Sequence, residues 1–194
     1  PPAPVAAGNV ETSQRLVDLV LASLAPLLPE RIPAASAGTM SNLTFGRSDG
    51  STWYETHGGG AGAAPGVAGE GAIQCHMTNT RNTPIEAFER DQPARVLGFG
   101  PRRDSGGAGS SRGGEGLSKR LRFLEPVRLG WLADRQRHVP PGTSGGRAGR
   151  PGRLRWRTLA GQAAEALEAG AEVWVETPGG GGHGRPPSGG RSAR

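Results

Sequence analysis

The chain has 194 residues and a formal net charge of +6, a length that suits one domain with a core or a part of a larger protein. Its longest apolar run, residues 16–28, is interrupted by Asp18, Ser23 and Pro26 and is too short to span a membrane. The single cysteine, Cys75, excludes an internal disulfide and indicates a reducing compartment, so we expect a cytoplasmic protein with no membrane partner.

Glycine and proline are abundant, with 34 and 17 residues, and approach the level that suggests disorder, roughly 25–30% of a chain. The glycines, however, cluster between apolar runs, at 58–71, 106–116, 142–152 and 179–184. Such clusters are typical of loops that join strands. The sequence therefore predicts a folded domain over 1–184 with long glycine-rich loops, and a disordered tail over 185–194.

The basic residues are nearly all arginines, and Lys119 is the only lysine among 23 lysines and arginines. An excess of basic over acidic residues is typical of proteins that bind nucleic acids. In 153–157, however, arginines alternate with apolar residues at the period of a strand, as on the solvated face of a sheet. We therefore expect no nucleic-acid partner.

The N-terminal region predicts a helix from about residue 10 toward 28, with Asn9 as the N-cap and Glu11 in its first turn. Its leucines and valines cover nearly the whole circumference, and a helix that is apolar on all sides must be buried on all sides. Little sequence precedes it to provide that cover. We therefore expect the chain to be the C-terminal part of a longer polypeptide.

From residue 51 onward the apolar pattern has period two. Strands are predicted at 51–57, 71–77, 93–100, 117–124, 126–134, 153–159 and 171–177. Residues 163–169 suit either a short helix or one arm of a hairpin. The predicted fold class is α+β: an N-terminal buried helix followed by a β-rich, mostly antiparallel body with long glycine-rich loops.

Segment 76–86 is rich in His, Thr, Asn and Arg and follows the short run 72–75, within the end of the predicted strand 71–77. Ordering so many polar groups costs entropy and desolvation, which a ligand or an internal network must offset. Alternation places His76 on a polar face and Cys75 on an apolar face. His76 is therefore a candidate general acid or base, metal ligand or hydrogen-bonded structural residue.

A second candidate acid, Glu55, shares one strand face with Trp53 and His57 and leads into the glycine-rich stretch 58–62. The position of Glu55 suits either a functional acid beside a flexible loop or a glutamate whose role is to form a salt bridge. Histidine spacing specifies no metal site, so a metal stays unknown. The Gly-x-Gly-x-x-Gly match at 179–184 leads into Arg-Pro-Pro instead of a helix, so we expect it to bind no dinucleotide.

Taken together, these segments resemble the B-type subunit of hydantoinases, a family that includes the C-terminal half of 5-oxoprolinases. The resemblance runs in collinear order from about residue 3 to 184. Its motifs are GNVETSQR at 8–15, GTMSNLTFG at 38–46, and segments 54–56, 58–62, 76–86, 104–109, 112–116, 134–135 and 177–182. The chain departs from the family pattern at Ser41, Gln74, Glu115 and Gln136.

The resemblance implies a hydrolase that opens the C–N bond of a five-membered cyclic amide or imide, of the 5-oxoproline or hydantoin type. ATP hydrolysis would be coupled to ring opening by an A-type partner subunit or domain, which agrees with the missing phosphate-loop motif here. A divalent metal of unknown identity would be compatible with this chemistry. We expect the isolated chain to be inactive.

The resemblance also implies the residues of the site. His76, Glu55, Asn79 and Arg81 are the predicted catalytic residues, with His76 or Glu55 preparing the water and Asn79 and Arg81 donating hydrogen bonds to developing negative charge. The predicted substrate-binding residues are Gly59, Gly60, Thr78, Thr80, Asn82, Asp104 and Arg135.

Three alternatives stay open at this point. Related subunits also occur in biotin-independent, ATP-dependent ketone carboxylases, and no residue here separates hydrolysis from carboxylation. The chain could instead be a non-catalytic assembly module, which glycine-rich loops and an apolar helix fit equally well. The third alternative is RNA binding through arginine and glycine.

Overall fold

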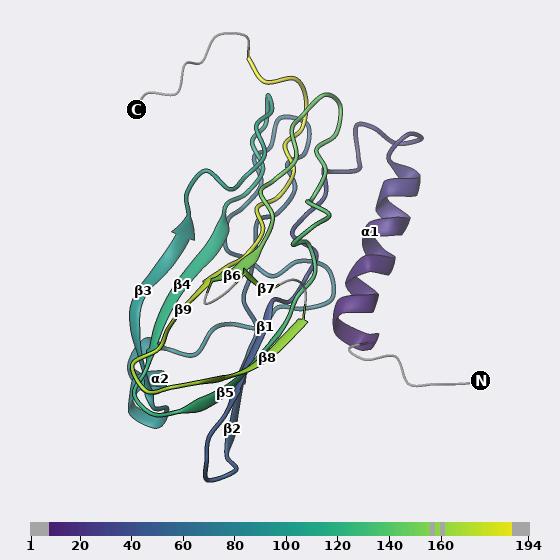
Figure 1. Ribbon diagram of the computed structural model, residues 1–194. Coiled ribbons are helices and arrows are strands. Elements are labelled where there is room, and N and C mark those ends of the chain that lie inside the picture. The colour runs from purple at the N-terminus through teal and green to yellow at the C-terminus, as the bar shows by residue number, and fades with distance from the viewer. Residues whose placement is uncertain (1–7, 156–157, 160–161, 188–194) are drawn as a thin grey trace, which may run out of the picture.

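The computed structural model describes residues 8–155, 158–159 and 162–187. It contains two antiparallel sheets, a bundle of extended glycine-rich segments continuing from one end of them, and a helix that stands beside this bundle (Figure 1). The helix α1 (Ser13–Leu24) follows a single π-helical turn (Gly8–Thr12), and a short helix α2 (Ile85–Asp91) lies at the far end of the sheets. The prediction of an α+β fold with a mostly antiparallel body is confirmed.

The first sheet has the order β2-β1-β5-β8 and the second has the order β3-β4-β9-β6-β7. All pairs between these strands are antiparallel. The strands are β1 (Asn42–Gly46), β2 (Thr52–Glu55), β3 (Ala94–Arg102), β4 (Gly116–Phe123), β5 (Val127–Leu132), β6 (Arg153–Arg155), β7 (Thr158–Leu159), β8 (Gln162–Leu167) and β9 (Glu172–Glu176).

The core lies between the two sheets, because alternate residues of both point into one cluster of buried apolar side chains. Strands β1 and β5 supply Leu43, Phe45, Val127, Leu129 and Trp131, and strands β4 and β9 supply Leu121, Phe123, Val173 and Val175. Phe88 of α2 closes the cluster by packing edge-on against Phe45, with ring centroids 6.4 Å apart.

The outward face of the second sheet carries the alternating arginines. Arg120 and Arg122 of β4 pair with Glu172, and Arg153 and Arg155 of β6 pair with Glu176. The arginines therefore lie on a solvated, salt-bridged sheet face, as the strand period of 153–157 predicts for β6.

The glycine-rich segments 58–63, 69–72, 105–114, 140–149 and 177–184, together with the alanine-rich segment 34–37, are here called the glycine bundle and run side by side with few strand ladders (Figure 1). Backbone hydrogen bonds join them: Gly60 N–H donates to Pro178 O at 3.0 Å, and Gly180 N–H donates to Gly114 O at 2.9 Å. A Cβ at Gly60 would overlap the Gly114 carbonyl oxygen, and one at Gly180 would overlap the Ala61 carbonyl oxygen. Glycine is required here because the backbones approach too closely for a side chain.

One predicted strand is wrong, and the predicted helix is present but differs in its burial. The strand predicted at 71–77 is absent, because Ala72 and His76 adopt left-handed φ angles of 52° and 61°, and only Ile73 forms an isolated bridge, to Gly59. The predicted helix is not buried on all sides: Leu16, Leu19 and Val20 are 58%, 63% and 57% exposed.

The sequence prediction missed β1 and α2, and residues 162–167 form the hairpin arm instead of the short helix. Among the described residues, no helix has the length and apolar character needed to cross a bilayer. Residues 188–194 of the predicted tail lie outside the described residues.

Candidate functional site

The polar face of α1 is turned toward the body of the protein. Four polar residues at helical spacing, Glu11, Gln14, Arg15 and Asp18, form one stripe. Gln14, only 1% exposed, donates from Nε2 to Cys75 O at 3.1 Å, and Arg15 donates to the Gly38 carbonyl oxygen. Ionic and polar contacts therefore attach this helix to the body.

At the N-terminal end of the stripe, the Glu11 carboxylate accepts three hydrogen bonds. The donors are Thr39 Oγ1 at 2.7 Å, Met40 N at 3.0 Å and Asn42 Nδ2 at 2.8 Å. Burial raises the pKa of Glu11 above its ordinary value, although the Thr39 and Met40 hydrogen bonds oppose this shift. Glu11 thus fixes the segment that leads into β1.

At the other end, the Asp18 carboxylate joins three positively charged or proton-carrying groups. His76 Nε2 lies 2.8 Å from its Oδ1, while Arg15 and Arg135 lie 2.7 Å and 2.5 Å from its Oδ2. Burial would raise the pKa of Asp18, but the His76 hydrogen bond and the two arginines outweigh it and hold the pKa below its ordinary value. Asp18 is therefore a fixed negative charge that orients the His76 ring.

Two of the residues that meet at Asp18 have unusual backbones. His76 and Arg135 both have a φ of 61°, in the left-handed region that residues other than glycine rarely adopt. Such conformations cost about 1–3 kcal/mol each and concentrate at functional sites. The structure thus holds a strained arrangement around the Asp18 carboxylate.

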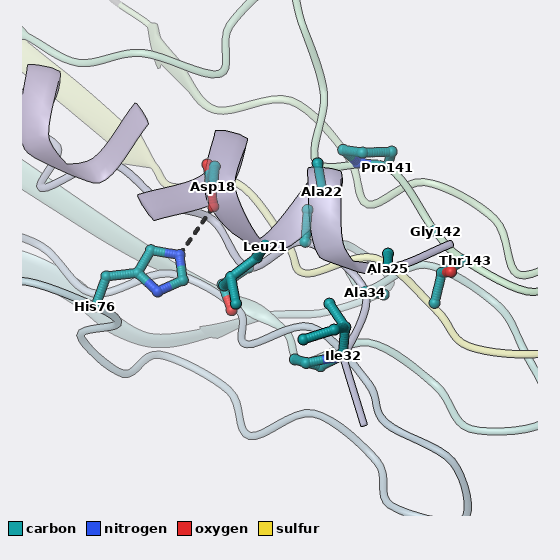
Figure 2. Close-up of a pocket in the computed structure, with 13 residues that line it drawn as sticks. Asp18, Leu21, Ala22, Ala25, Ile32, Ala34, His76, Pro141, Gly142 and Thr143 are labelled. Atoms are coloured by element: carbon teal, nitrogen blue, oxygen red, sulfur yellow. Dashed lines mark hydrogen bonds and ion pairs between the residues drawn. The ribbon is translucent and has the colours of Figure 1, made fainter. Parts of the chain in front are cut away.

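A cavity of about 230 Å³ lies beneath α1, and His76 and Asp18 form its polar end (Figure 2). Most of its wall is apolar, from residues of α1 and of segments 32–35 and 141–143, including Leu21, Ala22, Ala25, Ile32, Ala34 and Pro141. The His76 side chain is 12% exposed. An apolar wall with convergent polar groups at one end is the usual form of a small-molecule site.

A second polar group lies inside the sandwich. Glu55, with its side chain 3% exposed, forms an ion pair with Lys119, whose side chain is 2% exposed, and lies 3.2 Å from His57 Nε2. The other oxygen of Glu55 accepts from Thr83 N–H at 2.6 Å. Burial would raise the pKa of Glu55, but His57 and Lys119 outweigh it and lower the pKa to about 2.

The surroundings of this ion pair are aromatic and fully packed. The Lys119 ammonium lies 4.9 Å from the Phe88 ring centroid and 5.4 Å from that of Trp53. His57 Nδ1 lies 3.1 Å from Ser41 O, which makes Nδ1 the donor because a carbonyl only accepts. Glu55 therefore connects the sandwich to the start of α2 through Thr83.

The structure brings some predicted site residues together and separates others. His76 and Arg135 meet at Asp18, whereas Glu55 is buried and does not line the cavity. Asn82 Nδ2 donates to Thr56 O at 2.9 Å and so anchors the end of the segment.

The rest of segment 76–82 is mainly open to solvent. Asn79, Thr80 and Arg81 are exposed, and the Thr78 and Thr80 hydroxyls lie 3.1 Å apart. Of this segment, only His76 lines the cavity.

The other three predicted substrate-binding residues lie elsewhere. Gly59 and Gly60 are buried inside the glycine bundle, where an added Cβ would meet neighbouring atoms. Asp104 is exposed and pairs with Arg112 at 3.2 Å. None of the three lines the cavity.

Neither of the cofactors considered for the chain has an evident site in the described ranges. No group of three or more His, Cys, Asp or Glu side chains gathers there in a way that could hold a metal ion. Lys119, the only lysine, is buried against Glu55 and cannot reach a nucleotide phosphate.

Sequence reasoning missed Arg15, Asp18 and Lys119. A signal existed for the first two, because they are three residues apart and interrupt an otherwise apolar helix. For Lys119 the signal was the alternation of β4, which places this lysine on the inward face of the strand. A buried lysine needs a carboxylate partner.

Comparison with known proteins gives a consistent result. A model of the hydantoinase B/oxoprolinase family matches residues 1–186. The 5-oxoprolinase 1 of Arabidopsis thaliana is 43% identical over 189 residues, which cover 94% of this chain and 14% of that protein. An uncharacterised protein of Methanocaldococcus jannaschii is 42% identical over 191 residues, covering 95% of this chain and 34% of that protein.

Solved structures agree with these relatives. The ATP-dependent caprolactamase from Pseudomonas jessenii has a TM-score of 0.67 and 25% identity, covering 86% of this chain and 33% of that one. A nucleotide-free acetone carboxylase has a TM-score of 0.61 at 17% identity, covering 81% and 27%, and this likeness shows the fold alone. The chain thus spans between 14% and 34% of the length of the relatives and structures named here.

Proposed function

Because the chain belongs to the hydantoinase B/oxoprolinase family, we propose that it forms part of a hydrolase that opens the C–N bond of a cyclic amide or imide. The five-membered ring of 5-oxoproline or a hydantoin is the proposed substrate type. The match of 43% identity to a 5-oxoprolinase over 94% of the chain is the observation that carries this proposal. The similarity to an ATP-dependent caprolactamase supports the same reaction class.

The cavity beneath α1 is the proposed position of the ring. The alanines and the isoleucine of its wall suit the methylene edge of a small ring, and the amide would face His76. His76 takes a proton from the attacking water as the new bond forms at the carbonyl carbon. The C–N bond then breaks, and His76 returns the proton to the departing nitrogen.

Asp18 acts through His76. Its carboxylate holds the ring of His76 by the 2.8 Å contact and stabilises the imidazolium that forms during proton transfer. Arg15 and Arg135 keep Asp18 ionised, so both are positioning residues. Glu55 has a similar supporting role: its bond to Thr83 N–H, together with Asn82, fixes the end of the segment that His76 begins.

Asn79 and Arg81 stay the predicted donors for negative charge on the substrate. Both are exposed, so they would reach a substrate only if further protein closes over segment 76–82. ATP is assigned to an A-type partner subunit or domain, as the family resemblance implies, and the sequence, which contains no Gly-x-x-x-x-Gly-Lys motif, agrees with this assignment. ATP would supply the phosphoryl group that activates the ring carbonyl oxygen, and this group would leave as inorganic phosphate when the carboxylate of the opened ring forms.

The experiment replaces the matched segment of the Arabidopsis 5-oxoprolinase 1 with this chain and measures ATP-dependent opening of 5-oxoproline and of hydantoin. We expect the chimera to be active and His76→Gln to lower kcat by about 10²–10⁴-fold, the usual contribution of a general acid–base. The control is His138→Gln, at an exposed histidine outside the cavity. A His76→Gln chimera with unchanged turnover would refute the assignment.

Two other functions have some support. The fold shared with acetone carboxylase is compatible with ATP-dependent carboxylation of a ketone. ADP release from the chimera with ketone and bicarbonate, but not with a cyclic amide, would favour it. A non-catalytic assembly module is favoured by the exposed apolar side of α1, and a chimera indifferent to both His76 and Asp18 substitutions would support it.

A further inference from the structure

Helix α1 has its polarity inverted relative to an ordinary surface helix. The helix stands beside the body (Figure 1), and its polar stripe contacts the body while its apolar side is exposed to solvent. The exposed side chains form a second stripe, here called the outer stripe: Leu16 at 58%, Leu19 at 63%, Val20 at 57% and Leu24 at 37% exposure on α1, continued by Leu27 at 75% in the turn that follows the helix.

The contacts of α1 fix this orientation. Turning the helix to bury the outer stripe would remove Asp18 from Arg135 and His76 and would remove Gln14 from Cys75 O. Leaving those buried polar groups unpaired is costly, so the stripe cannot be hidden by rotation. The exposure therefore follows from the fold.

The chemistry of the outer stripe limits what can cover it. From residue 16 to 29 the only charged side chain is Asp18, which faces inward. The one hydroxyl on this side, Ser23 Oγ, donates to Leu19 O at 2.8 Å and needs no further partner. A contiguous apolar patch of this kind marks an interaction site for an apolar partner.

A lipid surface suits the stripe poorly. Helices that lie in a membrane interface carry basic residues on the polar side that borders their apolar face. The only basic residue of α1, Arg15, points toward the body and is engaged by Asp18 and Gly38 O. An apolar protein surface remains the matching partner.

We propose that an apolar segment covers the outer stripe. This segment would belong to the same type of subunit as this chain and would correspond to the part of the relatives' sequences that lies outside the matched region. The matched region accounts for 34% of the Methanocaldococcus jannaschii relative, which leaves most of that polypeptide as a source of such a segment. Within α1, residues 16, 20 and 24 of the outer stripe have the i, i+4 spacing of a helix-packing ridge. This proposal is independent of the reaction proposed above.

The test compares this chain alone with a chimera in which it replaces the 191 matched residues of that relative. The probe is the double substitution Leu19→Ser and Val20→Ser. Leu124→Ser is the matched control, because Leu124 is 49% exposed in the connection between β4 and β5. In the isolated chain we expect the double variant to leave Tm unchanged and to weaken binding of a hydrophobic dye. In the chimera we expect Tm to fall by at least about 5 °C, with no such difference for the control.

A labelling measurement keeps the test independent of Tm. In a Cys75→Ser background, Val20→Cys should react with a maleimide at least about tenfold more slowly in the chimera than in the isolated chain, because burial slows access to a thiol. Equal labelling and equal Tm changes in the two proteins would overturn the proposal. A homodimer of the isolated chain that the double variant dissociates would overturn it as well, since a second copy would then be the occupant.

Discussion

Replacing Lys119 by methionine should destabilise the protein far more than replacing any surface arginine. Methionine keeps the length and the apolar stem, but it leaves the Glu55 carboxylate buried without its cation. Breaking a buried ion pair by removing one partner costs about 3–5 kcal/mol. That cost is a large part of the total stability of a domain, about 5–15 kcal/mol.

The expected result is a lower urea midpoint and a fall in Tm on the order of 10 °C, since each kcal/mol corresponds to about 2–4 °C at this size. Arg122→Met is the matched control, because Arg122 also pairs with a glutamate but has a side chain that is 50% exposed. An exposed pair of this kind contributes at most about 1 kcal/mol. Adding Glu55→Gln to Lys119→Met should restore part of the loss, because no unpaired charge is then buried.

The reasoning depends on the pair being desolvated. If Lys119→Met and Arg122→Met change the free energy of unfolding equally, Glu55 must be hydrated, and its role in fixing Thr83 would have to be abandoned. Far-UV circular dichroism of both variants before unfolding verifies that the comparison starts from folded protein.

The remaining predictions concern pH, the glycine bundle and α1. The pKa of Glu55 is lowered from 4.5 to about 2, so its ionised form contributes about 3 kcal/mol to stability above pH 4.5, and this contribution is lost as the pH falls toward 2. The free energies of unfolding of wild type and Glu55→Gln should therefore converge as the pH is lowered. Curves that stay parallel would contradict the shift. Gly60→Ala should destabilise the protein by at least about 2 kcal/mol in urea, because its Cβ would overlap the Gly114 carbonyl oxygen, whereas Gly100→Ala has open space and should be near neutral. The substitution Asp18→Asn weakens the ion pairs that hold α1 against the body, so trypsin should cleave after the exposed Arg31 faster than in wild type. Equal cleavage rates would indicate that these contacts do not hold the helix.

Local pattern was sufficient for much of the β-rich body. Strand alternation predicted that Glu55 and His57 share a face, and both side chains are buried there beside Lys119. It also predicted the solvated arginine face of β6, where Arg153 and Arg155 pair with Glu176. These features depend on the alternation of side chains between the two faces of a strand, which can be read directly from the local sequence.

Features that depend on distant contacts were not predictable in the same way. The apolar period of α1 is real, but its orientation is set by Asp18 meeting His76 and Arg135, which are 58 and 117 residues away in the sequence. The strand predicted at 71–77 fails because His76 takes a left-handed backbone, which nothing in the polar and apolar pattern indicates. The glycine-rich segments were predicted as loops, yet their backbones pack together as a bundle.

The position of the substrate ring is the central claim, and filling the cavity tests it most directly. In the chimeric 5-oxoprolinase, Ala25→Leu would narrow the cavity from its α1 wall without touching His76 or Asp18. We predict that KM for the cyclic amide rises by at least about tenfold while kcat changes little, because ground-state and transition-state binding are lost together. An unchanged KM in a folded, active Ala25→Leu enzyme would contradict the account.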